Sequence, residues 1–475
     1  MKKYITVKEA ADNWGVSNQQ VCILCREGKV EGAQKERGQW VIPATSSKPI
    51  DGRKTRIHKR KHDPDAKFRY IDLFAGVGGF HQAMDKLKGE CIMAAEINQA
   101  CVETYTENFK TYEGYVRGDV NKINPKDIPE FDVVCAGFPC QPFSKAGLQK
   151  GFEDETRGNL FYKIMDILDD HPEAKYVVLE NVRNLADKTE NWAVIQEELS
   201  QRDFLITKEP LILSPSDFRI PQIRERVYIL GIKKDECNEK IREQGYITKE
   251  DLNLSKYLKK CRMGDALSIL EENAPDEYVI SEEQTLMINA WDEFRIATGI
   301  GVIGFPLWIH CFGVGENDTE KVYQNLEYYD MPKWKQKYVE KNRKFYLEHR
   351  NFIDAWIVRY NMLDRIRLYQ KFEWNCGTDV TDIKNAIIQV RQSGIRVKRT
   401  TFFPSLVAIV NTPIIWDAHK NAYRHITPRE AANLQNFKKS YKFKGTDQQI
   451  YKQLGNSVNV KVVKILCENL FKLSK

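Results

Sequence analysis

Short apolar runs alternate with helix-like stretches across the middle of the chain, from residue 68 to about residue 235. Each run is brief and nearly continuous, which is typical of a strand buried on both faces of a sheet. The clearest runs are 68–74, 91–95, 132–136 and 176–179. After the first run, apolar residues recur with helical spacing. Strands that alternate with helices predict βαβ units and a doubly wound α/β fold with a mainly parallel sheet.

The first 43 residues follow another pattern, with two short helical segments and then an alternating stretch. Thr6 and Glu9 have the spacing of a capping box, in which each side chain satisfies a free backbone donor at a helix start. A second helix is predicted after Ser17, and residues 30–43 predict a small β-wing. The segment resembles the winged helix-turn-helix of the excisionase and MerR-like families.

That resemblance implies contacts between this segment and DNA. Amide side chains near the start of the second helix would read base edges, because amides pair well with adenine, and basic wing residues would add charge. The residues concerned are Asn18, Gln19, Gln20, Lys35 and Arg37. The alternative is a protein-binding helical module whose surface happens to be charged.

The length of the chain and the distribution of its charge indicate how it is organised into domains. Its 475 residues are enough for roughly three domains. Residues 1–62 hold 14 Lys and Arg against 6 Asp and Glu, whereas the remainder holds 59 against 60. All of the excess positive charge therefore lies in the first part of the chain, which favours a polyanion partner there. Residues 1–43 are predicted to be a separate unit, and residues 44–66 a basic linker.

Several classes of protein are not expected. The N-terminus lacks the apolar stretch of a signal peptide, and no apolar run is long enough to span a bilayer. Eleven cysteines, scattered without a paired framework, favour a reducing, cytoplasmic location. Cys22 and Cys25 form a Cys-x-x-Cys pair, but no second pair completes a zinc site, so packing within a helix is predicted. Neither a membrane nor a metal is expected as a partner.

A glycine-rich turn follows the first buried strand and precedes a helix, as in a nucleotide-binding βαβ unit. Glycine lets the backbone approach a ligand closely, and a helix N-terminus favours an anionic group. Glu96 ends the next strand, where it can hold ribose hydroxyls, and Asp119 ends the third. Acidic groups at successive strand ends, without a phosphate-binding lysine nearby, favour S-adenosylmethionine over a dinucleotide.

Two residues at neighbouring strand ends suit chemistry on cytosine. Cys140 lies in the run Gly-Phe-Pro-Cys-Gln-Pro-Phe-Ser after the fourth strand, and Glu180 ends the fifth. A thiolate that adds to C6, with an acid at N3, makes cytosine C5 nucleophilic enough to attack a methyl sulfonium. A lone cysteine is more often a small core residue, but the flanking prolines and the polar Gln141 argue against a core position.

Five motifs occur in the order found in bacterial C5-cytosine DNA methyltransferases, and the chain resembles that family over residues 68–235 and about 399–475. The motifs lie at residues 72–80, 139–141, 180–182, 222–226 and 453–458. The resemblance implies that Cys140 is the nucleophile and that Glu180 holds N3. It also implies that Arg224 and Arg226 orient the substrate and support the cysteine loop.

The same resemblance implies a cofactor site for S-adenosylmethionine. Its residues would be Phe74, Ala75, Gly76, Gly78, Gly79, Glu96, Ile97, Asp119, Val120, Pro139, Leu160, Asn456 and Ser457. Ile97 departs from the family pattern, because many relatives have an aromatic residue there to stack on adenine. Gln141 and Ser144 would contact DNA, and residues 144–158 resemble the loop that closes over a flipped cytosine.

In this family residues 236–398 would form an inserted α+β target-recognition domain, with a return to the catalytic core over residues 399–475. Aromatic residues recur with helical spacing between Trp334 and Tyr360, which predicts a helix packed into a core. The interleaved Lys335, Lys337, Lys341, Arg343 and Lys344 could instead face DNA phosphates. Later basic residues lie where relatives approach the major groove, at Arg391, Arg396, Lys398 and Arg399.

The sequence therefore predicts an enzyme that methylates cytosine C5 in a short double-stranded DNA site. It would belong to a restriction–modification system with a cognate endonuclease, and the N-terminal unit would repress a promoter or add affinity for DNA. Two alternatives stay open at this stage, a tRNA cytosine-C5 methyltransferase and a non-catalytic DNA-binding regulator.

Overall fold

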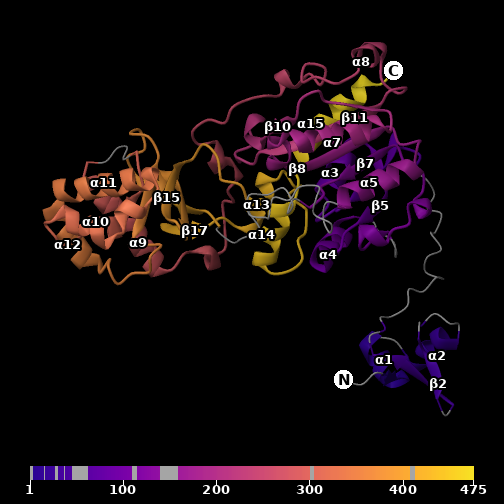
Figure 1. Cartoon of the computed structure of the whole chain (residues 1–475), viewed down its shortest axis with the longest axis horizontal. Helices are drawn as coiled ribbons and strands as arrows, with labels where there is room; N and C mark the ends of the chain where they lie inside the picture. The colour runs from indigo at the N-terminus through magenta and orange to yellow at the C-terminus, as the bar shows by residue number, and fades with distance from the viewer. Residues whose placement is uncertain are drawn as a thin grey trace. The chain divides into compact units, whose positions relative to one another are not determined.

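The computed structural model describes residues 4–14, 17–26, 30, 32–36, 38–44, 46, 63–109, 115–139, 159–299, 304–406 and 412–475. The chain divides into two compact units, the first formed mainly by residues 1–62 and the second by most of the remainder. Within the described residues, no helix is long and apolar enough to cross a membrane. Figure 1 shows both units with their elements labelled.

The N-terminal unit contains two helices and a three-stranded antiparallel sheet of order β1-β3-β2. Its elements are β1 (Tyr4–Thr6), α1 (Val7–Trp14), α2 (Asn18–Arg26), β2 (Gln34–Glu36) and β3 (Gln39–Pro43). The predicted capping box is confirmed, since the amide of Thr6 donates to the Glu9 carboxylate at 2.8 Å and the amide of Glu9 donates to the Thr6 hydroxyl at 3.2 Å. The assignment as a winged helix-turn-helix stays a prediction.

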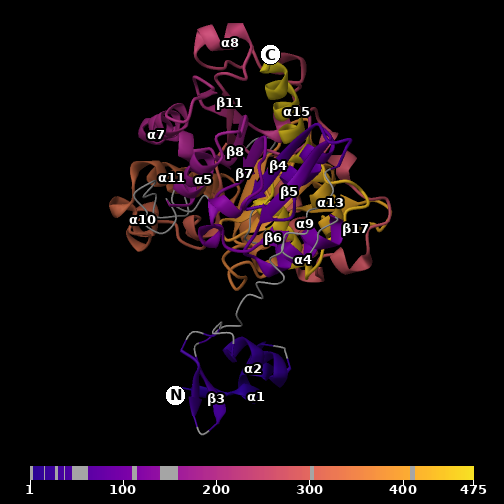
Figure 2. The same cartoon turned by 90° about the vertical axis from the view of Figure 1, so that its right-hand side faces the viewer.

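A mostly parallel sheet forms the centre of the second unit, with the order β10-β11-β8-β7-β4-β5-β6 and with β9 paired to β11. The parallel strands are β4 (Phe68–Leu73), β5 (Gly89–Ala95), β6 (Val116–Arg117), β7 (Val133–Ala136) and β8 (Tyr176–Val182). The antiparallel strands are β9 (Phe204–Ile206), β10 (Leu211–Leu213) and β11 (Arg226–Lys233). Figure 2 shows β8, β7, β4, β5 and β6 side by side in this order.

Helices cover both faces of this sheet, as the doubly wound prediction requires. Ile71, Val134 and Val177 are fully buried in one apolar core that includes residues of α5 (Asn159–Asp170) and α7 (Thr189–Ser200). The alternate residues point the other way, and the Tyr70 ring contacts His81 of α3 (Gly79–Asp85). The remaining helices of this region are α4 (Gln99–Asn108), α6 (Asn184–Asp187) and α8 (Glu239–Gln244).

The C-terminal segment returns to the same core. It forms α13 (Pro428–Leu434), α14 (Asp447–Asn456) and α15 (Val460–Leu470), and α15 packs against α3. The Tyr441 hydroxyl donates to the Val77 carbonyl at 2.5 Å, and the Gln453 side chain donates to the Ala100 carbonyl at 3.0 Å. These bonds join the end of the chain to the glycine-rich turn and the helix that follow the first two strands.

A second, mixed sheet lies in the region predicted for target recognition. Its order is β12-β13-β15-β14-β16-β17, and only β13 and β15 pair in parallel. The strands are β12 (Leu307–Trp308), β13 (Lys371–Asn375), β14 (Ala386–Arg391), β15 (Gly394–Arg399), β16 (Ile414–Asp417) and β17 (Ala422–His425). The accompanying helices are α9 (Glu282–Ala297), α10 (Thr319–Asn325), α11 (Lys333–Glu348) and α12 (Arg350–Tyr360).

The boundaries of this recognition region differ from the expected ones. β16 and β17 belong to its sheet, so the sheet continues past residue 399, where the return to the core was expected. At the other end, Ile247 bridges to Thr207 and Cys237 bridges to Ser474, so the core extends past residue 235. Strand pairing joins segments that are distant in the sequence, which a local pattern does not reveal.

The aromatic residues between Trp334 and Tyr360 are only partly core residues. Trp356 is fully buried, whereas Trp334 is 60% exposed. Arg343, expected to be able to face phosphates, is buried instead, and its guanidinium donates to the carbonyls of Phe312 at 2.6 Å and Glu316 at 2.8 Å. That arginine therefore satisfies backbone acceptors inside the domain.

Candidate active site

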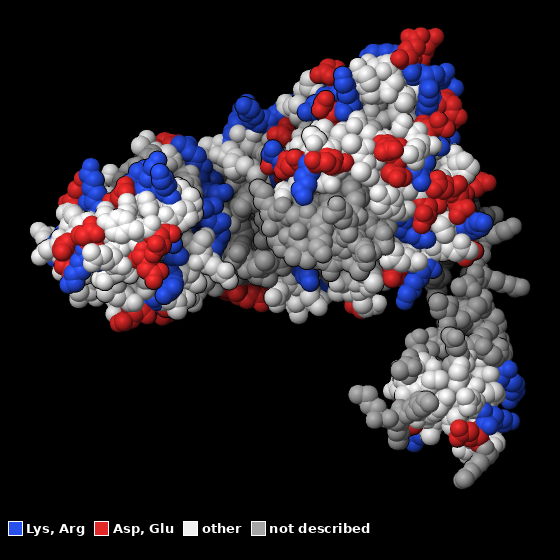
Figure 3. Space-filling model, in the orientation of Figure 1, with Lys and Arg blue, Asp and Glu red and all other residues white. Residues whose placement is uncertain are grey.

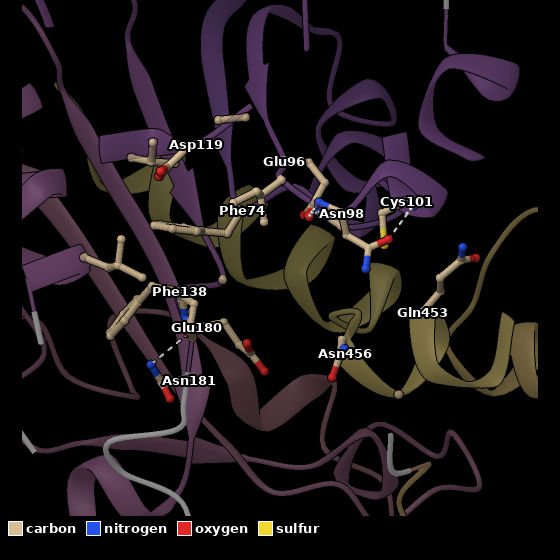
Figure 4. Close-up of a pocket in the computed structure, with 18 of the residues that line it drawn as sticks. Phe74, Glu96, Asn98, Cys101, Asp119, Phe138, Glu180, Asn181, Gln453 and Asn456 are labelled. Carbon is tan, nitrogen blue, oxygen red and sulfur yellow. Dashed lines mark hydrogen bonds between the residues drawn. The ribbon is translucent and has the colours of Figure 1, made fainter. Parts of the chain in front are cut away.

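A cavity of about 480 Å³ opens at the carboxyl ends of β4, β5, β7 and β8. Its lining includes the residues that follow these strands and part of the C-terminal return, as Figure 4 shows. The cavity lies where the strand order reverses, between β4 and β7, which is the position expected for a ligand in an open α/β sheet. Its volume suits a small organic molecule.

The glycine-rich turn after β4 has a backbone that few side chains tolerate. Phe74, Gly76 and Gly78 have φ angles of 56°, 53° and 75°. A Cβ atom on Gly78 would lie 2.3 Å from the ring of Phe109, and one on Gly79 would lie 2.6 Å from the Ser457 hydroxyl oxygen. The turn therefore needs glycine for conformation and for close packing against α4 and the C-terminal return.

Replacing Gly78 with alanine should destabilise the fold more than the same change at Gly245. Both glycines have a positive φ, 75° and 79°, but a Cβ on Gly245 meets no atom within 4 Å. Backbone strain should cost about 1–2 kcal/mol at either position. The clash with Phe109 should add about 1–3 kcal/mol at Gly78 alone. Urea unfolding measures both losses, and equal losses would show that the turn relaxes around the added methyl group.

Two of the predicted acidic residues are fixed on the wall of the cavity. The Glu96 carboxylate accepts hydrogen bonds from the amides of Gly76 at 2.8 Å and Asn98 at 2.7 Å. The Asp119 carboxylate accepts one from the amide of Asn121 at 3.0 Å. Ile97 also lines the cavity and is 75% exposed, so it leaves apolar surface open to a ligand. These contacts orient carboxylates toward a ligand that carries hydroxyl or amino donors.

Asp72 lies beneath this turn in β4, with no exposed surface. Burial raises its pKa well above the usual value, and the nearby negative charge of Glu96 raises it further. The carboxyl group of Asp72 therefore favours its neutral form over a wider pH range than an exposed aspartate does.

Other lining residues escaped the sequence-based prediction. They include Asn98, Cys101, Asn121, Phe138, Asn181, Gln453 and Gly455. Asn98 is also the N-cap of α4, where its side chain accepts from the amide of Cys101 at 3.2 Å. The sequence held one signal for Asn98, namely a polar residue just after an acidic residue at the end of a strand. Gln453 and Gly455 lie inside the last recognised motif, whose neighbours Asn456 and Ser457 were predicted.

Glu180 lies at the end of β8 and is 7% exposed. Arg226, on the adjacent strand β11, places its Nε 3.0 Å from a Glu180 carboxylate oxygen. Burial raises the pKa of Glu180, while the positive charges of Arg226 and Arg224 oppose that rise. The side chain can therefore carry a proton more readily than an exposed glutamate and can act as an acid or a hydrogen-bond donor.

Arg224 binds backbone carbonyls of the segment that returns to the core. It is 4% exposed, and its guanidinium donates to the carbonyls of Ser457 at 3.0 Å and Leu406 at 3.2 Å. It also lines the cavity. Arg224 therefore holds the C-terminal return against the edge of the site, and its expected role toward the substrate and the cysteine loop stays a prediction.

The segment that contains Cys140 follows Pro139, after which the described residues are interrupted until residue 159. Phe138 and Pro139 line the cavity, and the Asn181 side chain donates to the Phe138 carbonyl at 3.3 Å, which ties the end of β7 to β8. Four predicted site residues lie outside the described residues, Cys140, Gln141, Ser144 and Arg37. Among the residues that the structure does describe, no group of three or more His, Cys, Asp or Glu could hold a metal ion.

Comparisons with known proteins agree with this geometry. A family model described as "C-5 cytosine-specific DNA methylase" matches residues 68–472. The chain is 32% identical over 482 residues to the Type II methyltransferase M.AluI of Cellulosimicrobium cellulans, which covers 84% of this chain and 91% of that protein. It is 28% identical over 478 residues to M1.ScrFI of Lactococcus lactis subsp. cremoris, with coverage of 99% and 92%.

A solved structure shares the fold. The S. pombe Dnmt2 methyltransferase superposes with a TM-score of 0.51 at 17% identity, over 86% of this chain and 99% of that one. The family match covers most of the chain and includes the two sheets of the second unit. The chain belongs to the C-5 cytosine-specific DNA methylases and is a DNA cytosine-5-methyltransferase that uses S-adenosylmethionine.

Proposed function

We propose that the chain methylates C5 of a cytosine flipped out of a specific duplex site, through a covalent bond between Cys140 and C6. The observation that carries this proposal is Glu180, a buried acid with a raised pKa on the strand next to the one that leads into Pro139 and Cys140. A base inside a duplex hides C6, so the cytosine must leave the stack.

The proposed steps follow from these two side chains. The Cys140 thiolate adds to C6 while Glu180 donates a hydrogen bond or proton to N3, and the electron pair of the C5–C6 bond becomes available at C5. C5 would then take the methyl group that the bound cofactor supplies, and the electron pair of the broken carbon–sulfur bond would stay on sulfur. Loss of the C5 proton to a base and expulsion of the thiolate restore the aromatic ring and release Cys140.

The cavity walls suit S-adenosylmethionine. Glu96 and Asp119 present carboxylates to hydroxyl and amino groups, Ile97 offers an exposed apolar surface, and Phe74 lines the cavity beside the glycine turn. Asn456 and Leu160 line it as well. When bound there, the cofactor supplies a methyl group on a sulfonium centre. The chain's part is to hold it with that group toward the Glu180 side of the cavity.

A covalent adduct tests the proposal directly. Duplex DNA with 5-fluorocytosine in the target site should trap the wild-type chain, because fluorine at C5 cannot leave as a proton. Cys140→Ser should form no adduct, although it should still bind cofactor. The target site is first identified by bisulfite sequencing of DNA from cells that express the chain. Absence of an adduct with the intact chain on its own methylated site would overturn the mechanism.

The biological setting belongs to the same proposal. M.AluI and M1.ScrFI are named as Type II methyltransferases, which supports a restriction–modification system with a cognate endonuclease and a cytoplasmic location. DNA rather than tRNA is the favoured substrate, because the matched family is defined by DNA methylation. Radioactive methyl transfer to duplex DNA but not to tRNA is the expected result.

A second function is proposed for the N-terminal unit, repression of the chain's own promoter or of a partner's. It has an apolar core separate from the methylase, and M1.ScrFI aligns over 99% of the chain, so this unit has a counterpart in that relative. Asn18 and Gln19 are exposed at the start of α2, and Lys35 is exposed on β2. Added affinity for the methylated site is the competing role.

Deleting residues 1–50 should spare methylation and abolish binding to the promoter fragment. The catalytic cavity is built entirely from the second unit, so its chemistry does not need the first. Mobility shift with promoter DNA and methyl transfer to target DNA measure the two activities on one preparation. Lost methylation with unchanged promoter binding would contradict the assignment.

A further inference from the structure

The recognition sheet has an apolar face and a polar face. Phe372 of β13 and Ile395 and Val397 of β15 are fully buried in the core with the helices of this region. The alternate residues lie on the opposite face, where Glu373 is the register partner of Arg396 and Asn375 that of Lys398. On β14, Gln389 is opposite Arg396, and Arg391 lies two residues further along the same face.

A cavity of about 920 Å³ adjoins this polar face. Its basic lining residues come from β15, and aromatic residues form its rim. The lining includes Trp308, Trp334, Tyr338, Arg396, Lys398 and Arg399. Trp334 is 60% exposed, so the rim offers a free ring surface. Figure 3 shows a band of lysine and arginine beside the region that Figure 1 labels β15.

The basic side chains near this face differ in whether a carboxylate pairs with them. Arg396 forms an ion pair with Glu373, and Arg399 forms one with Asp379. Lys398 and Arg391 are half-buried, and burial and the charge of Arg396 lower the pKa of both side chains. Among the described residues, the Arg391 Nε is buried without a hydrogen-bond acceptor, and no carboxylate pairs with Lys398. One half-buried donor, the Arg391 Nε, therefore lies beside like charges without an acceptor, which is costly unless an acceptor-rich group binds there.

We propose that Arg391 and Lys398 are specificity-determining residues that donate to the acceptor edge of a guanine in the recognised site. Guanine presents two acceptors, O6 and N7, in the major groove, whereas adenine presents one acceptor with a donor and thymine one acceptor with a methyl group. Donors without acceptors of their own match the guanine edge. Arg396 and Arg399 pair with carboxylates, which fixes the orientation of their guanidinium groups. The inference rests on the proposed methylation of a specific duplex site.

Single substitutions test the assignment on the full-length chain. Once the methylated site is known, Lys398→Gln and Arg391→Gln should each lower kcat/KM on that duplex by about 10- to 100-fold. Lys249→Gln, at an exposed lysine outside this face, is the matched control and should change it little. Cofactor binding, measured by titration calorimetry, should stay at the wild-type value in all three variants, which shows that they are folded.

The base contact is tested by changing the DNA. Each guanine of the site is replaced in turn by 7-deazaguanine, which lacks the N7 acceptor. At the recognised guanine, the wild type should lose about 10-fold or more in kcat/KM, while Lys398→Gln or Arg391→Gln should lose little further.

Two results would overturn the inference. One is unchanged methylation by both variants. The other is an equal loss on every sequence with a shallower salt dependence, which would mark phosphate contacts instead of base reading. A wild-type chain that methylates no duplex would contradict the proposed function itself.

Discussion

Replacing Glu180 with glutamine is expected to lower the rate of methyl transfer by about 10²- to 10⁴-fold. Glutamine keeps an oxygen that can accept from Arg226, so the local packing should survive. It cannot release a proton to N3, so the ring is not activated for attack at C5. Single-turnover transfer of a radioactive methyl group to the target duplex measures the rate, and calorimetry should show unchanged cofactor binding.

The same residue should shape the pH dependence. Burial holds the pKa of Glu180 above its ordinary value, so the protonated, active form should persist to a higher pH than in an exposed glutamate. In the wild type, activity should include a limb that falls as pH rises through this raised pKa, and Glu180→Gln should lack that limb.

The free energy of unfolding should also depend on the protonation of Glu180. The folded chain holds the Glu180 proton to higher pH than the unfolded chain, so this group's contribution is present below the unfolded pKa and is lost as pH rises through the folded pKa. The stability of Glu180→Gln relative to wild type should therefore rise over that interval in urea unfolding.

Glu225→Gln is the matched control for Glu180. Glu225 is exposed beside Arg226 and pairs with Arg183 at 3.0 Å, so removing its charge alters the local field without touching the cavity. Its methylation rate should stay near the wild-type value. A Glu180→Gln rate within a few-fold of wild type, or equal losses in both variants, would remove Glu180 from the chemistry.

Arg424→Met is expected to destabilise the chain by about 3–5 kcal/mol. Arg424 in β17 is 1% exposed, and its guanidinium donates to Asp417 of β16 at 2.6 Å and to Glu430 of α13 at 2.8 Å. Glu430 also accepts from the amide of Glu271 at 2.8 Å. Removing the arginine leaves two buried carboxylates without their cation at the junction of the recognition sheet and the C-terminal return.

Arg399→Met provides the comparison for Arg424. Arg399 pairs with Asp379, but both side chains are largely exposed, at 40% and 58%. Water screens that pair, so its loss should cost less than about 1 kcal/mol. Urea unfolding of the two variants gives both values under identical conditions. Similar small losses would mean that water or rearrangement compensates for the buried cluster around Arg424.

Much of the catalytic core could be predicted from the sequence because its signals are local. The apolar runs located the parallel strands to within a few residues, since a strand buried on both faces must be apolar along its length. The glycine turn, Glu96 and Glu180 were found because residues at strand ends share one edge of a parallel sheet. Cys140 was identified by its motif, and its role stays a proposal.

Tertiary structure decided what a local pattern leaves open. Trp356 and Trp334 occur with the same helical spacing, but only Trp356 is covered by other elements. Gln453 joins a cavity made mostly from residues more than two hundred positions earlier, because α14 folds back onto the first strands. Periodicity states which side of an element is apolar, and nonlocal packing determines which surface covers it.

The recognition region shows most clearly the difference between what the sequence predicts and what the tertiary structure decides. The sequence marked Arg343 and Lys398 alike as basic residues that could meet DNA. In the folded chain Arg343 points inward and donates to backbone carbonyls, whereas Lys398 lines a cavity beside the polar face of a sheet. By itself the sequence determined the chemistry done to cytosine. Which basic side chains lie together on one face of the recognition sheet was decided by strand register, because register sets which side chains share a face.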